Sequence, residues 1–203
     1  EMERTLQVLD CAILVISGTG GVQGHTQTLW KLLERYHIPT LLFVNKMDLD
    51  GADRAGCLAQ LREQLHDGCV DFIQAREGES LQEQVAMCEE AALERYLETG
   101  TVKDGEIRRL VRERRLFPCW FGSALRLEGV EAFLEGLERY APIPDYPAEF
   151  GAQVYKIGRD AQGGRLTYLK VTGGSLKVKD LLSGGTVAAG GEAPWEEKVD
   201  QIR

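Results

Sequence analysis

The 203-residue sequence lacks several features that would assign a chain to a class at once. It has no apolar run of the roughly 18 residues that a membrane-spanning helix needs, and its first ten residues are too charged for a signal peptide. Its three histidines are far apart, and its five cysteines form no CxxC pair. We therefore expect no membrane span, no disulfide framework and no metal site, and we expect a cytoplasmic protein with reduced thiols.

The chain also lacks an excess of basic residues. It has 24 Lys and Arg against 32 Asp and Glu, a net charge of −8. This balance argues against a protein that binds nucleic acid through bulk charge. Residues 1–148 contain 16 basic and 25 acidic side chains, whereas residues 149–203 contain 8 and 7. The two parts of the chain therefore differ in character.

A strand–helix–strand pattern lies near the amino end. Residues 11–17, CAILVIS, are aliphatic and β-branched, which is typical of a strand buried on both faces of a parallel sheet. A glycine-rich turn, a helix predicted over 25–37 and a second buried strand predicted over 40–44 follow. This order predicts two parallel strands joined by a right-handed crossover.

The following segment is mainly helical. The apolar spacing predicts three helices, then a third buried strand, then a closing helix, over residues 55–67, 80–98, 104–115, 116–121 and 129–141.

A proline-rich segment divides the chain. Three of the six prolines fall within APIPDYPAEF, a composition typical of a linker. We expect one domain over residues 1–141, a linker over 142–148 and the start of a second domain over 149–203.

The second domain has a different pattern. Short alternating or β-branched runs separated by glycine pairs predict a small antiparallel barrel, with strands at 152–157, 165–171, 175–182 and 196–203. Because about fifty residues is short for a closed barrel, we expect the barrel to continue past Arg203. We also expect the chain to be a fragment of a longer protein.

Four polar residues follow the second predicted strand: Asn45, Lys46, Met47 and Asp48. Ligands of doubly wound sheets bind at the carboxyl ends of the strands. The Asp48 carboxylate can accept two parallel hydrogen bonds, from N1–H and the exocyclic amino group of guanine, which adenine cannot supply. Asn45 can donate to N7 and tie the loop to its neighbours, and the stem of Lys46 can lie over the purine face. We favour this interpretation over a plain polar turn.

Small residues follow the third predicted strand: Gly122, Ser123, Ala124 and then Leu125. They allow the backbone N–H groups of Ser123 and Ala124 to approach a base carbonyl such as guanine O6. Such a sequence is a weak signal alone. Because these small residues follow the next predicted strand after NKMD, the two segments together indicate a guanine site.

The run GVQGHTQTLWKLLERYHIPTLLFVNKMDLDGAD resembles translational GTPases of the elongation factor G type. NKMD matches their fourth GTPase motif and GSAL their fifth, and VYKIGRDAQGGRLTYLKVTGGSLKVKDLL is similar to the start of their β-barrel second domain. Only 73 residues separate Asp48 from Gly122. That insert is shorter than in elongation factor G and closer to the ribosomal protection proteins that confer tetracycline resistance.

The resemblance implies an α/β fold: the carboxyl-terminal part of a Rossmann-like P-loop GTPase with a doubly wound parallel sheet, followed by the start of a small antiparallel β-barrel domain. It implies a cytoplasmic GTP-binding translation factor that acts on the ribosome and hydrolyses GTP as an intact protein. Its implied partners are a guanine nucleotide and the ribosome, without a membrane. Its implied guanine-binding residues are Asn45, Lys46, Asp48, Ser123 and Ala124.

The phosphate-binding loop GxxxxGK[ST] and the DxxG motif of that family are absent from this sequence. The nearest match, residues 18–26, has its outer glycines one position too far apart and His25 where a lysine is needed. The resemblance makes GTP or GDP the expected ligand. Mg²⁺ is expected only with the missing N-terminal part, because that part would carry the phosphate-binding loop. No catalytic residue is expected in this fragment.

Three alternatives stay open. One is an elongation factor G or class-II release factor paralogue, and another is a ribosome-binding scaffold that does not hydrolyse GTP. The third is a dinucleotide oxidoreductase, because Gly18, Gly20 and Gly24 lie between a strand and a helix. Their spacing differs by one residue from GxGxxG, and Asn45, not an acidic residue, ends the next strand.

Overall fold

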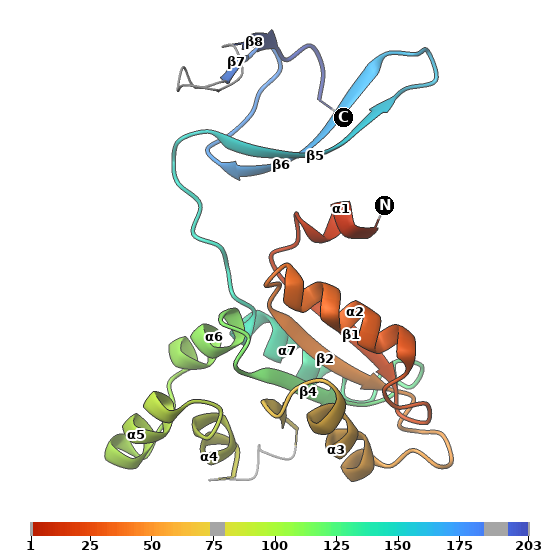
Figure 1. The fold of residues 1–203 in the computed structure, drawn as a ribbon, viewed down its shortest axis with the longest axis vertical. Helices are drawn as coiled ribbons and strands as arrows, with labels where there is room; N and C mark the ends of the chain where they lie inside the picture. Colours follow the sequence, from red (N-terminus) through yellow and green to blue (C-terminus); the bar gives the residue numbers. More distant parts are fainter. Residues whose placement is uncertain (1, 74–79, 185–194, 203) are drawn as a thin grey trace. The chain divides into compact units, whose positions relative to one another are not determined.

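The computed structural model describes residues 2–73, 80–184 and 195–202, and the chain divides into two compact units, Glu1–Pro144 and Asp145–Arg203. The division lies within the segment 142–148, where we expect the linker. The first unit (Figure 1) contains, in chain order, α1 (Met2–Leu6), β1 (Ala12–Ser17), α2 (Gly24–Arg35), β2 (Thr40–Asn45), α3 (Arg54–Gln64), β3 (Cys69–Asp71), α4 (Ser80–Ala86), α5 (Glu90–Thr99), α6 (Asp104–Arg112), β4 (Phe117–Phe121) and α7 (Val130–Tyr140).

The four strands of this unit form one parallel sheet in the order β1-β2-β4-β3. Leu42 of β2 lies opposite Leu14 of β1 on one side and Cys119 of β4 on the other. The predicted parallel strand–helix–strand unit is confirmed. The predicted burial of the first strand on both faces is wrong, because β1 lies at the edge of the sheet and its Ile13 and Val15 are 44% and 59% exposed. Both edges of β2 are paired and a hydrophobic cluster covers each of its faces, so every residue from Thr40 to Val44 is buried.

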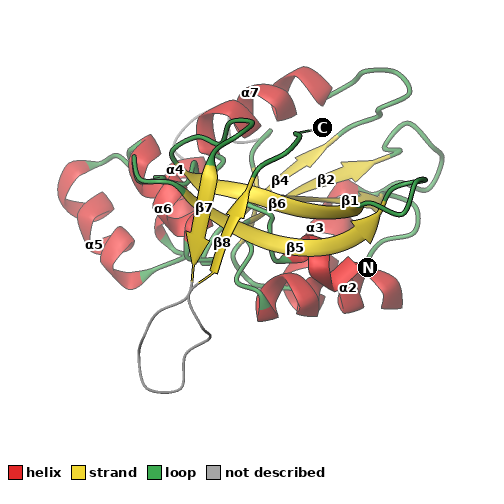
Figure 2. Ribbon diagram, turned by 90° about the horizontal axis from the view of Figure 1, so that it is seen from above, coloured by secondary structure: helices red, strands yellow, loops and turns green. Residues whose placement is uncertain are grey.

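Helices cover both faces of the sheet, so the fold is the doubly wound α/β class that the sequence predicts (Figure 2). Leu41 and Phe43 of β2 pack on one face with side chains of α4, α5, α6 and α7. Leu42 and Val44 pack on the other face with side chains of α2 and α3. This alternation follows from the two-residue period of a strand.

The single helix predicted over 80–98 is wrong, because the chain forms two helices there, α4 and α5. Glu89 lies between them in an extended conformation, with φ −155° and ψ 136°. The break lets both helices bury small apolar side chains in the core: Val85 and Ala86 from α4 and Ala92 from α5 are fully buried. One straight helix would carry these residues along a single direction, whereas two helices follow the curved surface of the sheet.

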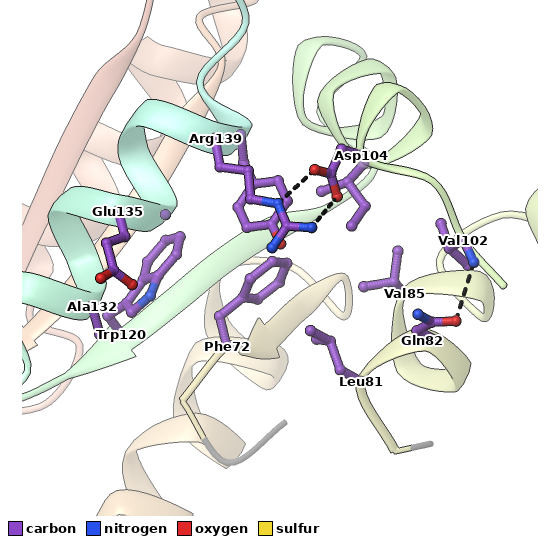
Figure 3. A pocket seen from close by; sticks show the side chains of 13 residues that line it. Phe72, Leu81, Gln82, Val85, Val102, Asp104, Trp120, Ala132, Glu135 and Arg139 are labelled. Atoms are coloured by element: carbon purple, nitrogen blue, oxygen red, sulfur yellow. Dashed lines mark hydrogen bonds and ion pairs between the residues drawn. The ribbon is translucent and has the colours of Figure 1, made fainter. Parts of the chain in front are cut away.

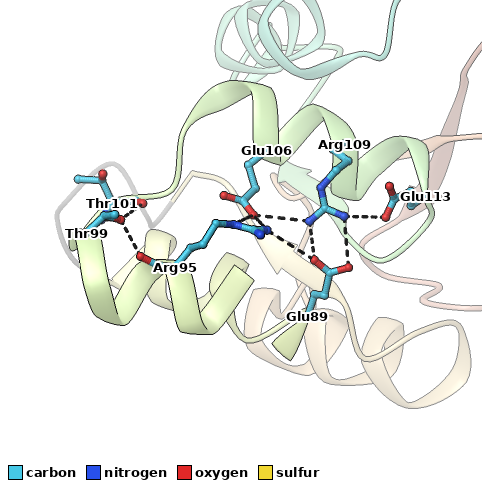
Figure 4. Close-up of polar contacts among 7 residues, drawn as sticks. All are labelled: Glu89, Arg95, Thr99, Thr101, Glu106, Arg109 and Glu113. Carbon is cyan, nitrogen blue, oxygen red and sulfur yellow. Dashed lines mark hydrogen bonds and ion pairs between the residues drawn. The ribbon is translucent and has the colours of Figure 1, made fainter. Parts of the chain in front are cut away.

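The residue at this break also takes part in a network of charges (Figure 4). Glu89 forms an ion pair with Arg109 of α6, and Arg109 reaches Glu113 at 2.7 Å. Arg95 of α5 donates from Nε to Glu106 of α6 at 2.9 Å. The hydrogen bond from Arg109 holds the pKa of the Glu89 carboxyl below its ordinary value, and the same contact raises the pKa of Arg109. The network joins α5 and the break to α6.

The short strand β3, Cys69–Asp71, is not predicted from the sequence. Three residues are too few for a periodic pattern, and the strand forms only because β4 offers it a parallel partner, with Val70 opposite Pro118. The side chain of Asp71 is held by Arg54, whose Nε donates to the carboxylate at 2.6 Å.

The second unit contains two antiparallel pairs: β5 (Gly151–Arg159) with β6 (Arg165–Gly173), and β7 (Leu181–Gly184) with β8 (Trp195–Lys198). The predicted antiparallel character is confirmed. The run predicted over 175–182 is a strand only at its end, because Lys179 takes a left-handed conformation with φ 77°. The run predicted over 196–203 ends as a strand at Lys198.

Among the described residues, none of the helices is long and apolar enough to cross a membrane.

The contact between α7 and β4 tests the packing of the first unit. Gly136 of α7 faces the indole of Trp120, and an added Cβ would overlap that ring. We expect Gly136→Ala to lower the free energy of unfolding by about 1–3 kcal/mol, as overpacking does in close-packed cores. Urea unfolding followed by tryptophan fluorescence measures the change.

The matched control is Gly105→Ala in the first turn of α6, where an added Cβ meets open space. It should leave stability unchanged or raise it by up to about 1 kcal/mol through helix propensity. Equal stability of the two variants would contradict the packing described for α7.

Candidate functional site

The two polar loops of the sequence analysis meet at one edge of the sheet. Strands β2 and β4 are neighbours and parallel, with Val44 opposite Phe121. The loop after β2 and the loop after β4 therefore leave the sheet side by side, although 73 residues separate Asp48 from Gly122 in sequence.

Backbone hydrogen bonds continue from the strands into these loops. The Gly122 N–H donates to the Val44 carbonyl at 2.9 Å, and the Met47 N–H donates to the Gly122 carbonyl at 3.0 Å. These backbone bonds alone fix the position of one loop relative to the other along the strand direction.

Asn45 ties the loops together through its side chain. Its Oδ1 accepts from the Lys46 N–H at 2.8 Å and from the Ala124 N–H at 2.9 Å. The first bond accompanies a left-handed conformation at Lys46, with φ 64°, which a residue with a Cβ adopts only where its surroundings hold it. The expected link from Asn45 to its neighbours is thus present, and it runs to Ala124.

Asp48 lies between the two loops with only 8% of its side chain exposed. A side-chain hydrogen bond from Ser123 is the main reason why the pKa of the Asp48 carboxyl is below its ordinary value. Arg126 contributes a smaller effect in the same direction, with Nε 3.3 Å from Oδ2. Asp48 is therefore an oriented carboxylate that stays ionised at neutral pH.

Ser123 reaches the site through its hydroxyl group. Its backbone N–H, expected to approach a base carbonyl, donates instead to the Glu128 carbonyl at 2.9 Å. The Ala124 N–H donates to Asn45, so a base carbonyl there would share it with the asparagine. No sequence pattern predicts these partners, because they depend on how the loop after β4 folds back.

Two contacts of this site were missed in the sequence. The Gly18 N–H, directly after β1, donates to the Asn45 carbonyl at 2.7 Å. A Cβ at Gly18 would lie 2.5 Å from Met47 Sδ and 3.2 Å from the Asn45 carbonyl oxygen, so a larger residue there would have to displace the Met47 side chain. Arg126 is the second, and a single arginine in a loop gives no sequence signal. Leu125, between Ala124 and Arg126, is 91% exposed.

A pocket of about 300 Å³ lies in a different place, between α4, α6, α7 and β4 (Figure 3). Its walls include Phe72, Trp120 and Tyr140, and Arg139 donates to Asp104 at its rim at 2.5 and 2.9 Å. None of the five candidate guanine-binding residues lines it. The candidate site is an open edge formed by two loops, and the pocket is separate from it.

The part of the chain that the structure describes contains no group of three or more His, Cys, Asp or Glu side chains placed to hold a metal ion. What the edge offers is hydrogen bonding: an ionised carboxylate, a hydroxyl group and an amide. These groups suit the recognition of a polar ring edge.

Residues 1–143 match the family model described as the elongation factor Tu GTP binding domain. The chain belongs to this family. It carries a GTP-binding domain of the translational GTPases, which confirms the expected fold class and, for the family, the guanine nucleotide ligand. The dinucleotide oxidoreductase alternative is wrong.

A solved structure shows the same fold in a wider context. The chain is similar to a protein from Thermus thermophilus, ttk003000868, with a TM-score of 0.70 and 26% sequence identity over 90% of this chain. The similarity covers 35% of the Thermus chain, so this GTPase domain and its following strands span about a third of that protein's length.

The link through Asn45 can be tested directly. Asn45→Ala removes the acceptor of the Ala124 N–H, and a hydrogen bond of this kind contributes about 1 kcal/mol, so amide exchange at Ala124 should become about five times faster. Exchange measured by NMR at pH 7 gives the rate.

Asn45→Asp is the matched control, because it keeps Oδ1 as an acceptor. Its Ala124 amide should stay protected. An Ala124 exchange rate that is the same in Asn45→Ala as in the parent would show that the asparagine does not tie the loops.

Proposed function

We propose that the edge formed by residues 45–48 and 122–125 binds the guanine base of GTP or GDP. Asp48 accepts from N1–H and from the 2-amino group, one bond to each carboxylate oxygen. The observation that carries this proposal is the placement of Asp48: only 8% of its side chain is exposed and its Oδ2 lies 3.3 Å from Arg126 Nε, while a hydrogen bond from Ser123 keeps the pKa of its carboxyl below the ordinary value. Adenine has no pair of donors at the corresponding edge, so the carboxylate discriminates between the purines.

The other candidate residues have complementary parts. Because Oδ1 of Asn45 accepts two backbone N–H groups, its amide NH₂ is the group that can donate to guanine N7. Lys46 is exposed beside it, and its aliphatic stem can cover one face of the ring. Ala124 shares its N–H with O6, and Ser123 acts through Asp48.

For the longer protein we propose a translation factor that acts on the ribosome in the cytoplasm and hydrolyses GTP. Membership of the translational GTPases supports this proposal. The short insert between Asp48 and Gly122 supports a narrower one, ribosomal protection against tetracycline. Phosphate binding and Mg²⁺ belong with a phosphate-binding loop, which these 203 residues do not contain.

Base recognition can be tested with the chain itself. Asp48→Asn places an amide donor against the donors of guanine, but opposite the 2-carbonyl of xanthine that donor finds an acceptor. We expect GMP binding to weaken by at least about tenfold, as an unpaired polar contact implies, and XMP to become the preferred ligand. NMR titration with millimolar GMP, XMP and AMP measures all three affinities.

The control is Asp50→Asn, the same change at an exposed position two residues away. It should keep the parent's preference for GMP. If Asp48→Asn also kept that preference, the loop after β2 would be only a polar turn.

The chain alone should not hydrolyse GTP above the buffer rate, with or without ribosomes. Transition-state charge on the phosphates needs backbone N–H groups, a lysine and a metal-ligating hydroxyl from a phosphate-binding loop. Phosphate release in the presence of Mg²⁺ tests this expectation. Release that persists in the purified parent and is lost in an identically prepared Asp48→Asn variant would overturn it.

A further inference from the structure

The loop after β4 holds one arginine against the candidate base site. Ser123 and Glu128 pair across this loop, with N–H to carbonyl distances of 2.9 and 3.0 Å in the two directions. Leu127 has a left-handed conformation, φ 59°, and so has Gly129, φ 73°, where a Cβ would lie 2.6 Å from the Phe121 carbonyl. The backbone around Arg126 is therefore closed on itself and fastened to the end of β4.

This closure directs Arg126 toward Asp48. The Arg126 N–H donates to the Ser123 hydroxyl oxygen at 3.3 Å, which places the residue over the serine that orients the carboxylate. Its Nε lies 3.3 Å from Asp48 Oδ2. The arginine side chain is 60% exposed and the aspartate side chain 8%, so the guanidinium covers the carboxylate from the solvent side.

The same carboxylate is the group that we assign to the guanine edge. We propose that Arg126 covers Asp48 in the nucleotide-free site, and that an entering guanine base has to displace the guanidinium of Arg126 from the carboxylate. This inference rests on the proposed function. It makes Arg126 a positioning residue that lowers the affinity of the site for the base.

The exchange of partners is chemically balanced. Guanine offers two N–H donors in the plane of the carboxylate, so it can replace the hydrogen bonds that the guanidinium gives up. Adenine offers an acceptor at N1 and no exocyclic amino group at C2, so it cannot replace the hydrogen bonds that Asp48 would lose on leaving Arg126. The covering arginine therefore lowers the apparent affinity for every base that has to displace it by the same factor, while the donors of guanine at Asp48 supply the discrimination.

The expected effect is modest, because an exposed ion pair contributes little free energy. Arg126→Ala should tighten GMP binding roughly two- to fivefold, with the smaller change at high salt, where such pairs are screened. Arg126→Lys keeps the charge and should lie between the parent and Arg126→Ala. In an Asp48→Asn background, Arg126→Ala should have no such effect, because the pair no longer exists.

The experiment is an NMR titration of the 203-residue chain with GMP at two salt concentrations, about 20 mM and about 300 mM. The titration is repeated with neutral guanosine, which excludes contacts of Arg126 to the phosphate. Arg115→Ala is the matched control, since this exposed arginine precedes the amino end of β4, whereas the site lies at its carboxyl end. It removes the same charge and should leave GMP affinity unchanged.

A second readout needs no nucleotide. If Arg126 covers Asp48, Arg126→Ala raises the pKa of the Asp48 carboxyl, followed by ¹³C NMR, while Arg115→Ala does not. Tighter GMP binding together with this rise supports the inference. A parent that prefers GMP, with an Arg126→Ala variant of equal or weaker affinity and an unchanged Asp48 pKa, overturns it and leaves the proposed function intact. A parent without preference for GMP overturns both.

Discussion

Parallel pairing of β2 with β4 is the constraint on which the rest of the first unit depends. It aligns Val44 with Phe121, so two loops that are far apart in sequence begin at the same edge of the sheet, next to each other. The ladder then continues beyond both strands, through Gly122 to Val44 and through Met47 to Gly122. Asn45, Asp48 and the residues after Gly122 are placed by this extension of the sheet, and their side chains refine a geometry that the backbone already holds.

The helices between these two strands stabilise the pairing without taking part in the site. Helices α4, α5 and α6 cover the face where Leu41, Phe43 and Trp120 are buried, whereas α3 covers the opposite face. The arrangement of α4 and α5 depends on the break at Glu89. The backbone of Glu89 is extended there, and its carboxylate forms an ion pair with Arg109. A segment of this kind can vary in length while the two ends of the site stay in register, because the strands alone carry the alignment.

The site combines rigid and exchangeable contacts. Ser123, 1% exposed, lowers the pKa of the Asp48 carboxyl through a side-chain hydrogen bond, whereas Arg126, 60% exposed, lies with Nε 3.3 Å from Asp48 Oδ2. A hydrogen bond made under cover persists when a ligand arrives, and an ion pair at the surface can be exchanged for ligand contacts at little cost. In the function that we propose, this combination suits a base that offers two donors.

The sequence by itself determined the class of fold, the three longer parallel strands, the antiparallel character of the second unit and the residues of the candidate site. Apolar periodicity and motifs such as NKMD are local, and local signals survive in a single chain. The tertiary structure alone decided that β3 exists, that the helix predicted over 80–98 breaks, and that Gly18 approaches Met47. It also decided that Ser123 acts through its hydroxyl and that Arg126 faces Asp48. Each of these depends on partners distant in sequence, whose positions are set only when the strands pair and the loops close.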